Sequence, residues 1–216
     1  MDGQLAELFN LQLQHFSIWE AIAVALGLAY VLMAAKEIVW AWPAAFVSTA
    51  IYMIIFWEGN LPMQSALNLF YMGMAAYGWW LWQVQPSREA AANNTDVQPL
   101  AIHTWGIGRH ALWIGLGILL TFSFGGLLTL FEASQMPYLD AGVMVFSMMT
   151  TFLMARKVLE SWFYWIVINT FAVALYWQTG YPLTAMMFVA YMGLAWYGMI
   201  KWQLRFRAQT RTATAA

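Results

Sequence analysis

Cysteine is absent from the 216-residue chain, and charged residues are scarce, at 9% of the sequence. Without cysteine there is no disulfide framework, no thiolate metal site and no cysteine nucleophile. The net charge is only -1 and no long basic run occurs, which argues against nucleic acid as a partner. These absences exclude a secreted disulfide-rich module and a nucleic-acid-binding domain.

Apolar residues, in contrast, are abundant. Hydrophobic residues make up 62% of the chain, and its mean hydropathy is +0.61. An average soluble domain contains about 45–50% apolar and about 25% charged residues. Because long apolar segments cross a bilayer as helices, the composition predicts an all-α integral membrane protein.

The charged residues divide the chain into apolar segments of membrane-spanning length. The charge-free stretch 161–200 is too long for one span and is broken at 178–182, where Gly180 and Pro182 indicate a turn. The sequence therefore predicts seven transmembrane helices, at 18–35, 38–57, 61–83, 109–131, 138–155, 159–178 and 182–203.

The N-terminal segment, 1–17, lacks the basic start and the apolar run of a signal peptide. Its mixture of apolar and polar residues at 5–13 predicts a short interfacial helix that is not cleaved.

All nine lysines and arginines fall on one side of this seven-helix topology. The loops on the other side carry only acids, at Glu58, Glu132 and Asp140. Because short cytoplasmic loops retain basic residues, we expect a multi-pass protein of a bacterial-type inner membrane. Its N-terminus is expected outside and its C-terminus in the cytoplasm.

A direct repeat links the two halves of the chain. The string from Tyr71 to Gln83 returns from Tyr191 to Gln203, an offset of 120 residues, and Trp42 matches Trp162 at the same offset. Three helices are an odd number of spans, so two repeats joined directly would have opposite orientations in the membrane. The basic loops of the two repeats nevertheless lie on the same side of the membrane. One extra helix must therefore reverse the chain between them.

The predicted architecture is three plus one plus three helices, with parallel repeats about an axis along the membrane normal. Transporters built in this way bind their substrate at the repeat interface near mid-membrane. The predicted parts are an N-terminal interfacial segment at 1–17, a first repeat at 18–83, a cytoplasmic connector at 84–108, linker helix 4 at 109–131, a second repeat at 138–203 and a cytoplasmic tail at 204–216.

Three strings are similar to motifs of a known family: 77–80 (Tyr-Gly-Trp-Trp), 153–157 with Glu160 and Trp162, and 165–169 (Trp-Ile-Val-Ile-Asn). Together with the repeat layout, they resemble the PnuC family of vitamin transporters, which share the SWEET sugar-transporter fold. The resemblance runs from Trp19 to Trp202. It implies uptake of nicotinamide riboside by facilitated diffusion, with cytosolic phosphorylation trapping the substrate.

Relatives in that family carry thiamine or riboflavin instead. Asn68 stands where nicotinamide riboside members usually have Gln, so the resemblance leaves a thiamine transporter as the alternative. A membrane scaffold without a substrate is the more distant alternative.

Polar and aromatic side chains within the spans are the candidates for substrate binding, because polar groups are costly in hydrocarbon. Amides can recognise a carboxamide, an aminopyrimidine or ribose hydroxyls, and Trp and Tyr faces can hold a flat cationic ring. Helical spacing places these residues on shared faces of single helices. The predicted substrate-binding residues are Ser48, Tyr52, Gln64, Asn68, Tyr71, Asp140, Trp162, Trp165 and Asn169.

Structural roles compete with this interpretation. Interhelical Asn and Gln often serve only in packing, at about 0.6 kcal/mol each. Trp and Tyr gather at membrane interfaces, and Asp140 is as favourable in the first turn of a helix as it would be near a cation.

Enzyme chemistry is not indicated. His15, His103 and His110 have no acidic or histidine partner at ligand spacing, so the sequence predicts no metal, no cofactor and no catalytic residue. A retinal photoreceptor is excluded because Lys201, the only lysine of the last helix, lies in its final turn.

The expected partners are a small-molecule substrate and the lipid bilayer, and a homo-oligomer is left open. Ion coupling normally uses an ionisable group deep in the bundle, and every acid here lies near a surface. The sequence therefore predicts a passive facilitator.

Overall fold

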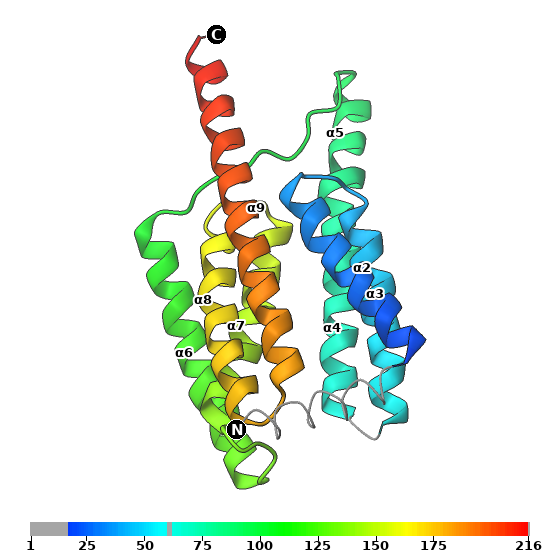
Figure 1. Cartoon of the computed structure of the whole chain (residues 1–216). Helices are drawn as coiled ribbons and strands as arrows, with labels where there is room; N and C mark the ends of the chain where they lie inside the picture. The colour runs from blue at the N-terminus through cyan, green and yellow to red at the C-terminus, as the bar shows by residue number, and fades with distance from the viewer. Residues whose placement is uncertain (1–16, 60–61, 216) are drawn as a thin grey trace. The chain divides into compact units, whose positions relative to one another are not determined.

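The computed structural model describes residues 17–59 and 62–215, which are helical apart from turns, loops and one isolated β-bridge (Figure 1). The predicted interfacial helix lies outside these residues. The predicted all-helical architecture is confirmed, with seven helices of 18 residues or more. The elements are α2 (Ile18–Ala35), α3 (Ala41–Glu58), α4 (Pro62–Trp79), the π-helix η1 (Trp80–Val84), α5 (Gln85–Asn93), α6 (Ile107–Leu130), α7 (Pro137–Ala155), α8 (Ser161–Gln178) and α9 (Pro182–Ala215).

Four of these helices are apolar and long enough to cross a membrane by length and composition: α2, α3, α6 and α7. The helices α4, α8 and α9 are at least as long as the shortest of the four but carry more Trp, Tyr, Asn and Gln. Those residues lower a hydropathy average without preventing a span, because Trp and Tyr favour the membrane interface and amides can pair inside a bundle.

The third predicted helix ends later than expected. We predicted its end at 83 followed by a connector at 84–108, but the helix continues through η1 and α5 to Asn93. Pro86 lacks a backbone N–H, and the wider π turn just before it keeps the chain helical, where a proline would otherwise end or kink a helix. The predicted tail at 204–216 is likewise helical as far as Ala215.

The chain forms two compact units, each described here by itself. Of the described residues, the first unit contains 17–103, 151–159 and 197–215, apart from 60–61, and the second contains 104–150 and 160–196. In the first unit, α3 packs against both α2 and α4. Hydroxyl groups reinforce this packing: Ser48 Oγ donates to the Ala23 carbonyl at 2.7 Å, and Ser65 Oγ donates to the Met53 carbonyl at 2.8 Å.

Close helix approach in the first unit depends on Gly78. Trp42, at the start of α3, is buried and its indole lies directly against the α carbon of Gly78 on α4. A methyl group at Gly78 would overlap the ring, whereas a methyl group at Gly73, five residues earlier, would meet no atom within 4 Å.

We therefore expect Gly78→Ala to destabilise the folded protein by about 1–3 kcal/mol, the usual cost of overpacking. The matched substitution Gly73→Ala is expected to leave the melting temperature unchanged or slightly raised, because alanine favours a helix. Thermal unfolding of the two purified variants measures the difference. Equal melting temperatures would contradict a close contact between Gly78 and Trp42.

Small residues also bring the helices of the second unit together. Gly117 of α6 faces the ring of Phe146 on α7, and Gly125 faces Tyr138. The buried face of α8 consists of Ile168, Asn169, Ala172 and Leu175. Between helices in a bilayer there is no hydrophobic driving force, so close packing of this kind stabilises their association through van der Waals contacts.

Candidate substrate-binding site

The second-repeat candidates of α8 share one helical face. Trp162, Trp165 and Asn169 are spaced i, i+3 and i+7 within a helix that is unbroken from Ser161 to Gln178. Trp162, like Ser161 beside it, is another buried residue of α8 and is only 1% exposed, whereas Trp165 is half-buried. Of the two indoles, Trp165 is the one with accessible ring surface.

Asn169 is a buried polar residue of α8. It is 3% exposed, so its side chain lies within the helix packing. Polar side chains inside membrane spans are costly in hydrocarbon and are often found at functional sites. Asn169 lies one helical turn from Trp165, and its amide can both donate to and accept from a bound molecule.

The same face of α8 continues to Tyr176, a residue that the sequence analysis did not select. Its ring stacks on Phe188 of α9, with ring centroids 5.2 Å apart and an interplanar angle of 9°. Asp140, in the first turn of α7, is half-buried and within electrostatic range of Tyr176. The i+7 spacing from Asn169 was the signal that could have identified Tyr176. Its contact with Phe188 could not be predicted in this way, because Phe188 lies on another helix.

The first-repeat candidates lie on α3 and α4 of the first unit, where Ser48 is engaged in the hydrogen bond to Ala23 described above. Tyr52 stacks on Phe56 at 5.7 Å and 15°, and Tyr71 contacts Phe70 edge-on. Gln64 is exposed, and its backbone carbonyl accepts a 2.9 Å hydrogen bond from Nδ2 of Asn68. Each of these first-repeat candidates thus has a protein contact or solvent access.

A histidine site that the sequence did not indicate joins the start of α6 to the start of α8. His110 Nδ1 lies 3.0 Å from the Tyr164 hydroxyl, and its Nε2 lies 3.8 Å from Glu160 Oε1. Glu160 and Tyr164 are 50 and 54 residues away from His110 in sequence, so their spacing carried no signal. No group of three or more potential metal ligands occurs within the described part of the chain.

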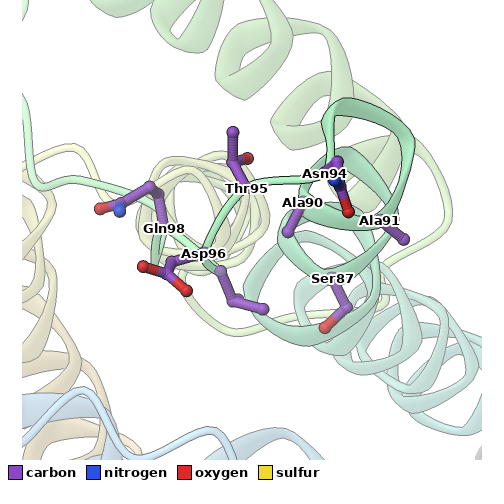
Figure 2. A pocket seen from close by; sticks show the side chains of 8 residues that line it. Ser87, Ala90, Ala91, Asn94, Thr95, Asp96 and Gln98 are labelled. Atoms are coloured by element: carbon purple, nitrogen blue, oxygen red, sulfur yellow. The ribbon is translucent and has the colours of Figure 1, made fainter.

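A concavity of about 760 Å³ lies on α5 and the segment that follows it. Its lining includes the polar side chains of Ser87, Asn94, Asp96 and Gln98 (Figure 2). It lies outside the apolar segments and contains none of the predicted binding residues. The concavity is therefore not the candidate site.

The sequence matches the family described as "Nicotinamide mononucleotide transporter" over residues 17–204, which is most of the chain. The chain belongs to this family. It is therefore a multi-pass membrane transporter of a small molecule and not an enzyme, as the sequence predicted.

Two relatives illustrate the range of the family. The riboflavin/roseoflavin transporter RibM of Streptomyces davaonensis is 27% identical over 213 residues, covering 95% of this chain and 94% of that protein. The nicotinamide riboside transporter PnuC of Escherichia coli is 22% identical over 200 residues, covering 85% and 84%. The relatives thus differ in their substrates.

The fold of the transporter is that of a solved structure, titled "Crystal structure of the Vitamin B3 transporter PnuC". The two chains superpose with a TM-score of 0.67 at 22% identity, covering 94% of this chain and 90% of the other. This likeness confirms the predicted resemblance to the PnuC family at the level of the fold.

Proposed function

We propose that this transporter is a passive facilitator for nicotinamide riboside, which phosphorylation in the cytosol traps after entry. That substrate combines a flat cationic ring with a carboxamide and a ribose. Trp165 offers a ring face for stacking, with a cation–π attraction of about 0.5–2 kcal/mol. Asn169 offers an amide that both donates and accepts. The proposed orientation has the N-terminus outside and the C-terminus in the cytoplasm.

The buried amide of Asn169, one helical turn from the accessible indole of Trp165, is the observation that carries this proposal. The amide can donate and accept hydrogen bonds. The indole face can stack on a planar ring. An amide and an indole on one face form a minimal binding site for a flat polar ring.

Riboflavin is the second candidate, because the alignment with RibM covers more of this chain at higher identity than the alignment with the E. coli nicotinamide riboside transporter. Its ring is flat but neutral, so it would use the stacking surface and the amide without the cation–π attraction. Thiamine, the alternative from the sequence, is a flat cation that lacks a ribose.

Passive transport is supported by the position of the acids. Glu20 and Asp140 lie in the first turns of α2 and α7, and Glu58 ends α3. None of the acids that the structure describes lies in the middle of an apolar span, where proton- or sodium-coupled transporters place an ionisable group. Substrate accumulation against its gradient in proteoliposomes, driven by pH or sodium, would overturn the passive mechanism.

Calorimetric titration of the purified protein with nicotinamide riboside, riboflavin and thiamine tests the substrate. We expect nicotinamide riboside to bind most tightly, and Asn169→Leu to weaken that binding by about 1–3 kcal/mol because a substrate group loses its partner. The control is Thr170→Val, whose hydroxyl bonds to Ile166 of its own helix. Binding of riboflavin alone would favour the second candidate, and binding of none of the three would refute a vitamin site.

A further inference from the structure

Two turns of the first unit have the same backbone conformation although they belong to different repeats. Glu37 follows α2 and Lys157 follows α7, and both adopt positive φ, at 58° and 55°. The backbone N–H of Ile38 donates to Met33 at 2.9 Å, and that of Val158 donates to Leu153 at 3.0 Å. Glu37 and Lys157 are therefore equivalent positions, separated by the repeat offset of 120 residues.

These equivalent residues bind each other. Lys157 Nζ lies 2.7 Å from Glu37 Oε2, and the side chains of Lys157 and Glu37 are only 4% and 10% exposed. Arg205 Nε, on the exposed flank of α9, donates to Glu37 Oε1 at 2.9 Å. In a two-fold arrangement, a residue can touch its own equivalent only at the symmetry axis. The ion pair thus marks the axis of the repeat.

Two equivalent tryptophans form hydrogen bonds next to this ion pair. Trp82 of η1 donates from Nε1 to the Ala155 carbonyl at the end of α7, at 2.8 Å. Trp202, its equivalent on α9, donates to the Ala34 carbonyl near the end of α2, at 3.0 Å. Each repeat therefore caps the first helix of the other. The ring centroids of Trp82 and Trp202 are 6.2 Å apart, and Lys157 Nζ lies 4.5 Å from the Trp82 ring.

The energetics of a buried ion pair suit a contact that must open and close. Desolvation of the two charges offsets most of their attraction, so the net stabilisation of the closed pair over a hydrated, separated pair is small. Burial also lowers the pKa of Lys157, against the opposing effect of its hydrogen bond to Glu37. Removing one partner, however, leaves an uncompensated buried charge, which is strongly unfavourable.

We propose that Glu37 and Lys157, with Trp82 and Trp202, form a latch that closes the basic end of the transport path. The basic end is the end of the helices that carries the lysines and arginines. In transporters of two repeats the substrate lies at the repeat interface, so a plug on the axis blocks one exit. The latch must separate in each cycle for the substrate to leave at that end.

The absence of native cysteine allows a direct test, because a single introduced thiol is the only one in the protein. Ala155 is fully buried beside Trp82, so an Ala155→Cys variant reports opening of the latch through its reaction with a membrane-impermeant maleimide. Adding Glu37→Gln is expected to raise the labelling rate roughly tenfold or more, because the closed state retains an unpaired charge. The control is Glu89→Gln, an exposed acid bonded only to Gln85, which should not change the rate.

Exchanging the charges tests whether the pair itself is responsible. Both turns already accommodate their residue at positive φ, so the double exchange Glu37→Lys with Lys157→Glu is geometrically conservative. The exchange is made in an Arg205→Gln background, because Arg205 would repel a lysine at position 37. Arg205→Gln by itself should change the labelling rate less than about twofold, because it removes only an exposed ion pair. The exchanged protein should fold and should label as slowly as Arg205→Gln alone.

Fast labelling of the exchanged protein, or wild-type labelling of Glu37→Gln, would overturn the latch. If Glu37→Gln fails to fold, the exchanged protein still tests the latch, because slow labelling of that protein requires an ion pair between positions 37 and 157. The inference rests on the proposed transport function but not on its substrate. The labelling needs no ligand, so failure of the substrate titration and failure of the latch are distinguishable.

Discussion

Trp165→Ala is expected to weaken substrate binding by about 1–3 kcal/mol, a loss of roughly 5–150-fold in affinity, while the protein stays folded. The indole is half-buried on the α8 face that carries the buried amide of Asn169, so its removal takes stacking surface from the ligand. Calorimetry with the best-binding compound measures the loss, and melting is recorded alongside.

Phe163→Ala is the matched control for this substitution. Phe163 is an exposed aromatic residue two positions away on α8, and it points away from the Trp165 face because residues two apart on a helix do not share a face. Its loss should leave the affinity unchanged. Wild-type affinity for Trp165→Ala would remove this residue from the site, and a large drop in its melting temperature would assign the indole to packing instead.

Trp202→Ala is expected to destabilise the protein by about 3–5 kcal/mol, the usual cost of truncating a buried aromatic side chain. Trp202 is fully buried, and its indole donates to the carbonyl of Ala34, a hydrogen bond that the substitution would remove. For a chain of this size the loss corresponds to a melting temperature lower by roughly 6–20 °C.

The control for Trp202 lies on the same helix. Trp196 is 53% exposed, so Trp196→Ala should shift the melting temperature little. Thermal unfolding in one detergent compares the two variants directly. Similar melting temperatures for both would show that the Trp202 brace contributes no stability of its own.

The helix positions were predictable because they depend on local chemistry. Charged residues interrupt apolar segments, and Pro137 and Pro182 begin helices where prolines are tolerated, so α7 and α9 start at or next to the predicted residue. The end of the third helix was not predictable in the same way. Pro86 is a helix-ending signal in sequence, and only the π turn before it allows the chain to continue.

The candidate site was predictable only in part. Spacing alone placed Trp162, Trp165 and Asn169 on one face, because helical geometry relates residues three and four apart. It gave no means of ranking the three, since burial and hydrogen bonding depend on neighbouring helices. The packing around α8 buries Trp162 and Asn169 and leaves Trp165 partly accessible.

By itself, the sequence determined that this protein is a helical membrane protein with an internal repeat, because composition, spans and an offset of 120 residues are properties of the chain. Tertiary structure alone decided that Glu37 meets Lys157 and that each repeat's tryptophan caps a helix of the other. The physical reason is the distance along the chain over which each interaction acts. Hydrophobicity and helix spacing act over a few residues, whereas an ion pair between positions 120 apart exists only after folding brings their turns together.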